Sequence, residues 1–122
     1  MIRILLACAG GMSTSLLMLR MQEEAEKRGV EVTVDAGPEK NIENLMGTFD
    51  VLLLGPQVRY AIGNVKKICE GKVPFDVIEM RDYGMVDGVK VLDKALKMYD
   101  DSINRRTNTS SSIFLKNFFH WR

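Results

Sequence analysis

The sequence predicts an α/β fold with four parallel strands and helices on both faces of the sheet. Strand-like and helix-like segments alternate four times along the chain, which is typical of such folds. Residues 2–7 and 50–54 are almost continuously apolar, as expected of strands that are buried on both faces. Right-handed crossovers then favour the strand order 2-1-3-4. In this order the second strand lies on one side of the first strand, and the third and fourth strands lie on the other side.

Composition indicates a single globular domain. The chain has 122 residues, of which 46% are hydrophobic, enough for one core. Its apolar runs are too short to cross a bilayer, and its first residues lack the pattern of a secretory signal. Cys8 and Cys69 lie in dissimilar surroundings and do not suggest a disulfide framework. We therefore expect a cytoplasmic protein in which Cys8 is a free thiol.

The charge is unevenly distributed along the chain. The net charge is +1, but four basic residues and no acidic residue follow position 104, so residues 1–104 carry a net charge of −3. A mildly acidic domain is a poor match for the phosphate backbone of nucleic acids. We therefore expect no nucleic acid partner.

The first strand and the first helix frame the most informative part of the sequence. The strand covers residues 2–7, with Arg3 near its start, and a loop follows at 8–13. A helix should begin at Ser13 or Thr14, either of which can cap it, and end near residue 28. Its apolar positions, which recur at helical spacing and should face the core, include Leu16, Leu17 and Ala25.

The next segments predict an edge strand and a short helix. Gly29 should end the first helix in a left-handed conformation. Residues 30–34 alternate apolar and polar side chains, which favours a strand at an edge of the sheet. Ala36-Gly37-Pro38 should break this strand, and a short helix is expected at 39–46.

The second half repeats the alternation twice. Residues 50–54 predict the most buried strand, and Gly55-Pro56 should form a loop after it. A helix is expected from residue 58 or 59 to 69, followed by a strand at 75–78. Tyr83-Gly84 should form a third loop at the same edge, before a last helix that Asp87 caps and that ends near residue 103.

Residues 105–122 depart from this pattern. A polar stretch at 107–112 is typical of a linker, and residues 113–122 are basic and aromatic. The sequence therefore predicts a folded domain at 1–104 with a tail outside it. Two interpretations of the tail stay open: a frayed or non-native end, or an amphipathic segment that contacts a membrane or a partner. His120 lies in this tail, and we assign it no catalytic role.

Cys8 and the residues after it form the candidate site. In open α/β sheets, ligands bind at the carboxyl ends of the strands, where Cys8 is expected. Small residues let backbone N–H groups turn inward, and the start of a helix adds unpaired N–H groups and the positive end of its dipole. Such a cradle suits a phosphoryl group, with Cys8 as nucleophile at its mouth. The expected phosphate-binding residues are Ala9, Gly10, Gly11, Met12, Ser13, Thr14 and Ser15.

Several other thiol chemistries are disfavoured by spacing. Cys8 has no Cys-x-x-Cys partner, and Cys69 should lie in a helix core, which argues against thiol–disulfide exchange. A cysteine-dependent phosphatase would carry an arginine six positions after the cysteine, where this chain has Thr14. No histidine is present in residues 1–104 to act as a protease-type base. A carrier that accepts and passes on a phosphoryl group remains.

Three motifs along this edge make a family resemblance specific. They are Leu-Ala-Cys-Ala-Gly-Gly-Met-Ser-Thr-Ser-Leu-Leu at 6–17, Val-Leu-Leu-Leu-Gly-Pro-Gln at 51–57, and Asp-Tyr-Gly at 82–84 with Asp-Gly at 87–88. In this order they resemble the lactose/cellobiose-type IIB component of the bacterial phosphoenolpyruvate-dependent sugar phosphotransferase system. The resemblance covers residues 1–104, and the tail has no counterpart in it.

The resemblance implies a phosphoryl relay. Cys8 would accept a phosphoryl group from a phosphohistidine of a IIA subunit, held by loop amides at 9–15. It would then pass the group to a sugar bound in the membrane IIC permease, with which the domain would associate peripherally. The resemblance implies no cofactor and no metal. The sugar is left open, because specificity in this family would lie mainly in IIC.

Two further residues are expected beside the site, and two rival functions stay open. Gln57 and Tyr83 lie on loops predicted to flank Cys8, and each could contact a partner or play only a structural part. One rival is a low-molecular-weight cysteine phosphatase. The other is an interaction module in which Cys8 is inert.

Overall fold

The computed structural model describes residues 1–8 and 12–106, which form alternating strands and helices. The elements in chain order are β1 (Ile2–Cys8), α1 (Met12–Arg28), β2 (Val32–Pro38), η1 (Glu39–Asn41), α2 (Ile42–Leu45), β3 (Val51–Leu54), η2 (Pro56–Ala61), α3 (Ile62–Cys69), β4 (Phe75–Val77), α4 (Met80–Gly84) and α5 (Gly88–Arg106). Here η denotes a 3₁₀ helix. The three strand–helix crossovers bring every strand back in the same direction.

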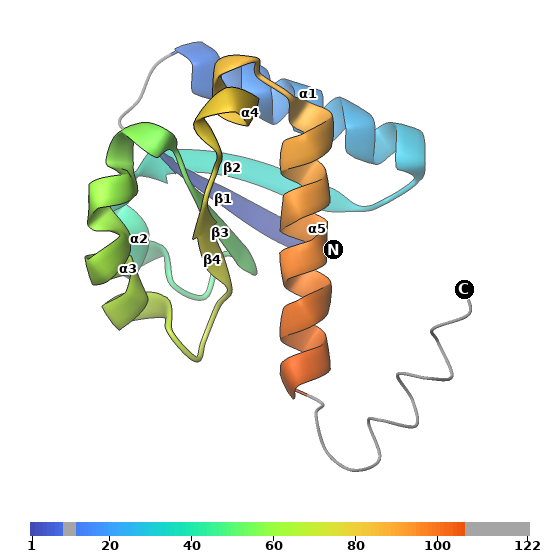
Figure 1. The fold of residues 1–122 in the computed structure, drawn as a ribbon. Helices are drawn as coiled ribbons and strands as arrows, with labels where there is room; N and C mark the ends of the chain where they lie inside the picture. Colours follow the sequence, from blue (N-terminus) through green and yellow to red (C-terminus); the bar gives the residue numbers. More distant parts are fainter. Residues whose placement is uncertain (9–11, 107–122) are drawn as a thin grey trace.

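The strands form one parallel sheet in the order β2-β1-β3-β4, which confirms the predicted class and order. β1 is central, with β2 on one side and β3 on the other. All four residues of β3 are buried, which confirms it as an interior strand. Because the strands are parallel, the segments that follow β1, β3 and β4 all start at one edge of the sheet, and Figure 1 shows α1, η2 and α4 beginning there.

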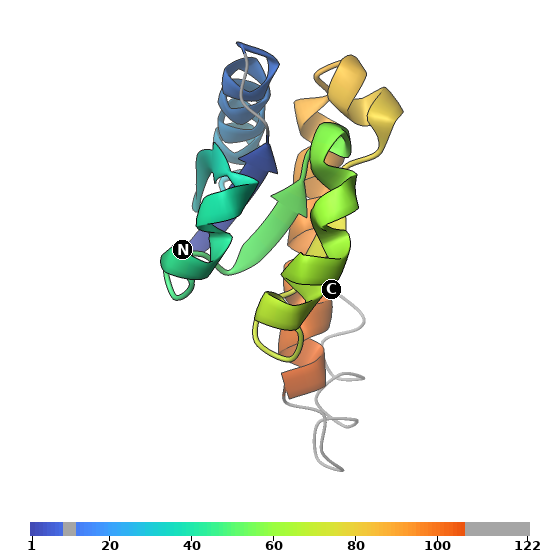
Figure 2. The same cartoon turned by 90° about the vertical axis from the view of Figure 1, so that its left-hand side faces the viewer.

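Two apolar clusters cover the two faces of the sheet. One joins alternate residues of β1 to Leu17, Met21 and Ala25 of α1 and to Leu92 of α5. The other joins the intervening residues of β1 and β3 to α2 and α3. Figures 1 and 2 show these two helix pairs on opposite sides of the sheet. The period-2 alternation of β1 thus divides its side chains between the two clusters, and Cys8 belongs to the α1/α5 cluster.

Two details of the first predicted helix and edge strand are corrected. Leu16 is 41% exposed, whereas Met21 is fully buried, because the inner face of α1 follows positions 17, 21 and 25. The predicted strand break at Ala36-Gly37-Pro38 is wrong, because all three residues belong to β2. Pro38 is tolerated since β2 is an edge strand that pairs only with β1, so no outer neighbour requires its missing N–H group.

The end of β4 also differs from the sequence prediction. Tyr83-Gly84 lies in the short helix α4 rather than in a loop, and the Tyr83 N–H donates to the Glu79 carbonyl at 3.0 Å. Two predicted helix boundaries are confirmed. Gly29 follows α1 with a φ of +69°, and the Asp87 carboxylate accepts the Lys90 N–H at 3.0 Å to cap α5. The predicted tail at 105–122 lies outside the described residues except for its first two, which end α5.

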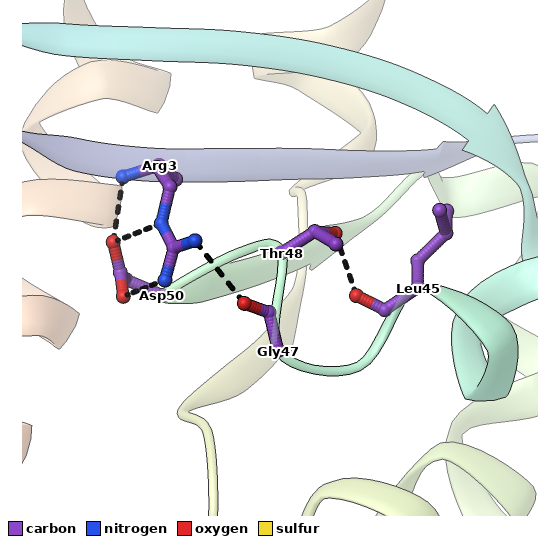
Figure 3. A network of polar contacts seen from close by, with 5 residues as sticks. All are labelled: Arg3, Leu45, Gly47, Thr48 and Asp50. Carbon is purple, nitrogen blue, oxygen red and sulfur yellow. Dashed lines mark hydrogen bonds and ion pairs between the residues drawn. The ribbon is translucent and has the colours of Figure 1, made fainter.

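An ion pair joins the amino ends of β1 and β3, at the opposite end of the strands from Cys8. Arg3 donates to both carboxylate oxygens of Asp50 at 3.1 Å, and Asp50 also accepts the Arg3 backbone N–H at 2.9 Å. A further nitrogen of Arg3 donates to the Gly47 carbonyl at 3.1 Å, as Figure 3 shows. These bonds join the start of β1 to the turn before β3, and they lower the pKa of Asp50 below its ordinary 3.8.

We predict that this pair contributes stability that acid removes. Because the pKa of Asp50 is lower in the folded chain, the contribution is complete above about pH 4 and is lost as the pH falls further. Urea unfolding of the wild type and of Asp50→Asn should therefore differ at neutral pH and converge in acid. A difference between the two that stays constant with pH would show that the carboxylate charge is not involved.

Candidate functional site

Cys8 occupies the carboxyl end of the central strand. It is the last residue of β1 and is in register with Pro38, the last residue of β2. On the other side, the Gly55 N–H donates to the Ala7 carbonyl at 2.9 Å, which ties the segment after β3 beside Cys8. The sulfur therefore lies where the segments after β1 and β3 meet, as the sequence predicts for a ligand site in a parallel sheet.

The Cys8 residue is buried, with only 3% of its surface exposed. The sequence predicts a thiol at the mouth of a cradle, and the structure instead places it inside the α1/α5 cluster. The reason is the central position of β1, because strands and helices enclose it on several sides. The residue therefore offers little surface to a group on another protein.

The predicted phosphate-binding residues are divided between described and undescribed parts of the chain. Ala9, Gly10 and Gly11 lie outside the described residues. Met12, Ser13, Thr14 and Ser15 form the first turn of α1. The N–H groups of a first helical turn have no partner within the helix. No acidic side chain lies in this turn to offset the positive end of the dipole. The turn therefore presents backbone donors at the carboxyl end of β1.

Thr14 and Tyr83 meet inside the molecule. Both are buried, and their hydroxyl oxygens are 2.9 Å apart, so one donates to the other. The bond joins the first turn of α1 to α4, which are far apart in the sequence. The Thr14 hydroxyl is therefore bonded to Tyr83. The group of Thr14 that could bind an anion is its backbone N–H, which lies in the first turn of α1. A contact of Tyr83 with a partner stays a prediction, since its side chain faces the core.

Gln57 and Gly55 flank the sulfur from the side of β3. Gln57 is exposed in η2. A Cβ built on Gly55 would lie 3.0 Å from Cys8 Sγ and 2.8 Å from Gln57 Oε1. The structure thus brings Gln57 to the position beside Cys8 that the sequence predicts. The sequence predicts only a loop at Gly55, although a glycine directly after a buried strand also indicates a close approach of neighbouring groups.

The second cysteine lies on the other face of the sheet. Cys69 is buried in the α2/α3 cluster, and its Sγ lies 3.9 Å from Met46 Sδ. Burial raises the pKa of the Cys69 thiol, which keeps it protonated and poorly nucleophilic. Cys8 and Cys69 therefore belong to separate clusters, in agreement with the prediction that they do not form a disulfide.

Comparisons with known proteins agree on one family. The family model described as "PTS system, Lactose/Cellobiose specific IIB subunit" matches residues 3–94. The galactose-specific and the cellobiose-specific PTS EIIB components of Lactococcus lactis are each 50% identical over 98 residues, 75% of this chain and 91% of each relative. The solution structure of the cellobiose-specific IIB component from Borrelia burgdorferi superposes with a TM-score of 0.71 at 34% identity, covering 83% of this chain and 94% of that one.

We predict that Tyr83→Phe destabilises the fold. It leaves the Thr14 hydroxyl buried without its partner, which costs about 1–3 kcal/mol. Urea unfolding measures the loss. The double variant Thr14→Val/Tyr83→Phe removes both polar groups and should recover most of it, because the unpaired hydroxyl is then gone. A Tyr83→Phe variant as stable as the wild type would contradict the buried bond.

Proposed function

The chain belongs to the lactose/cellobiose-specific IIB subunits of the sugar phosphotransferase system, and from this we propose that Cys8 is its phosphoryl carrier. IIB subunits are phosphotransferase components. In this proposal Cys8 accepts a phosphoryl group from a IIA subunit and passes it to a sugar bound in the IIC permease. The domain would act in the cytoplasm, in peripheral contact with that permease. No helix in the described parts, residues 1–8 and 12–106, has the length and apolar character of a membrane span.

One observation carries the proposal. Cys8 is a nucleophilic side chain at the end of the central strand β1, and the next described element of the chain is the first turn of α1, which starts at Met12. The N–H groups of that turn and its dipole favour a phosphoryl group bound beside them. Nearby, Gly55 has no side chain where a Cβ would lie 3.0 Å from the sulfur.

The first transfer would exchange one bond to phosphorus for another. The Cys8 thiolate attacks the phosphorus of a IIA phosphohistidine in line with the departing nitrogen. The S–P bond forms, the N–P bond breaks, and the imidazole nitrogen takes up the proton that the thiol has lost. Backbone donors around the phosphoryl oxygens stabilise the charge that spreads over them in the transition state. Since Cys8 is only 3% exposed, IIA would have to dock closely over the end of β1 to reach the sulfur.

The second transfer would return Cys8 to its thiol form. A sugar hydroxyl attacks the phosphocysteine, the O–P bond forms, the S–P bond breaks, and the hydroxyl proton ends on the cysteine. In this proposal the general base for this step belongs to IIC. The two Lactococcus relatives are equally similar to this chain and are named for different sugars, which agrees with specificity residing outside the IIB subunit.

The phosphatase alternative finds no support at Thr14. A cysteine phosphatase of this loop type would carry an arginine at that position to grip the phosphate with two hydrogen bonds. Thr14 is buried instead, and its hydroxyl is bonded to Tyr83. The site would therefore hold a phosphoryl group without the side chain that promotes its hydrolysis.

Labelling by phosphorylated IIA tests the carrier role. Wild-type protein should gain one phosphoryl group, read by intact mass, with a phosphorus NMR signal in the range of a phosphothiol. Cys8→Ser should lose that signal. Cys69→Ser is the matched control, because its sulfur is buried on the other face of the sheet, and it should be labelled as the wild type is. Equal labelling of Cys8→Ser and the wild type would place the nucleophile elsewhere.

Hydrolysis of an aryl phosphate separates the carrier from the phosphatase. Because no arginine closes the loop, the protein alone should show no steady turnover above that of Cys8→Ser. Release of phosphate at a constant rate over many turnovers, dependent on Cys8, would overturn the carrier assignment in favour of the hydrolase.

A further inference from the structure

The backbone at Gly55 does not itself demand a glycine. Its φ of −64° and ψ of 150° are ordinary values for any L-amino acid. A side chain at Gly55 would instead crowd its neighbours, because a Cβ would lie 2.8 Å from Gln57 Oε1, which the exposed glutamine could move, and 3.0 Å from Cys8 Sγ in the core. Both atoms therefore face the point that a side chain at Gly55 would occupy. The glycine keeps the carboxamide of Gln57 and the sulfur of Cys8 facing a common space.

The Gln57 carboxamide is free to act in that space. Gln57 is exposed, and among the described residues its amide has no hydrogen-bond partner. Its backbone is nevertheless fixed near Cys8, since Gly55 bonds to Ala7 at 2.9 Å and the Val58 N–H donates to the Gly55 carbonyl at 3.0 Å. Rotation about the last side-chain bond exchanges the amide oxygen and the NH₂ group, which offers two donors.

We propose that the Gln57 carboxamide donates a hydrogen bond to the phosphoryl group carried by Cys8, and that Gly55 provides the room for this contact. The inference rests on the proposed carrier role of Cys8. The first turn of α1 supplies donors from one side, and Gln57 supplies one from the side of β3. A phosphoryl dianion has three oxygens to satisfy, and bonds to a charged acceptor are stronger than neutral ones.

This role differs measurably from that of a docking contact. A residue that only contacts IIA changes the rate of transfer equally in both directions and leaves the equilibrium constant unchanged. A residue that contacts the phosphoryl group on Cys8 stabilises the phosphorylated form and therefore shifts the equilibrium between phosphorylated IIA and phosphocysteine. The equilibrium constant is thus the decisive measurement.

The test compares Gln57→Glu with the wild type and with Gln22→Glu. Gln57→Glu keeps the shape of the side chain but replaces the donor by a carboxylate that repels the phosphoryl oxygens. Gln22 is the other glutamine of the chain, and its Nε2 donates to the Val32 carbonyl at 2.8 Å, so the control makes the same charge change where the amide is structural. Phosphorylated IIA is the probe, and thermal unfolding checks that each variant folds.

Gln57→Glu should lower the equilibrium ratio of phosphocysteine to free thiol by about tenfold or more, and Gln57→Ala by less. Gln22→Glu should leave that ratio unchanged. Gly55→Ala should lower it as well, because the new methyl group fills the shared space. If Gln57→Glu leaves the equilibrium ratio unchanged, whether or not it slows the transfer, the proposed hydrogen bond from Gln57 to the phosphoryl group is wrong. Failure of the wild type to be labelled at Cys8 would instead overturn the carrier role itself.

Discussion

The geometry of this protein depends on a parallel sheet with β1 at its centre. Parallel strands end at a common edge, so the segments after β1, β3 and β4 are brought together whatever their own sequences. Cys8 is the last residue of the central strand and lies where those segments converge. The burial that stabilises β1 also encloses the sulfur, which is 3% exposed. One constraint therefore both positions the thiol and limits access to it.

A hydrogen bond across the core holds two of these segments in place. The apolar contacts of α1 and α5 with the sheet tolerate small rotations, since they are not directional. The bond between the Thr14 and Tyr83 hydroxyls is directional, and breaking it leaves a buried polar group unpaired. It therefore fixes the first turn of α1 relative to α4. The proposed carrier site would depend on such fixing, because the direction of its backbone N–H groups is set by the helix and not by side-chain rotation.

Sequence patterns were most reliable where a single physical preference decides the outcome. The apolar run of β3, the left-handed Gly29 and the Asp87 cap all follow from local chemistry, and the structure has each of them. Patterns failed where tertiary context competes. Ala36-Gly37-Pro38 reads as a break but extends β2, because an edge strand leaves the outer side of Pro38 unpaired. Leu16 fits the apolar period of α1 yet is exposed, since only one of two adjacent leucines can face the sheet.

The sequence alone determined the fold class, the strand order and the placement of Cys8 before a helix, because alternation of strand and helix patterns with short connections permits few arrangements. Only the tertiary structure decided how far the thiol is buried, that Thr14 bonds to Tyr83, and that Gly55 and Gln57 face the sulfur. These are contacts between residues far apart in the chain. They depend on side-chain packing across the sheet edge, which no local periodicity encodes.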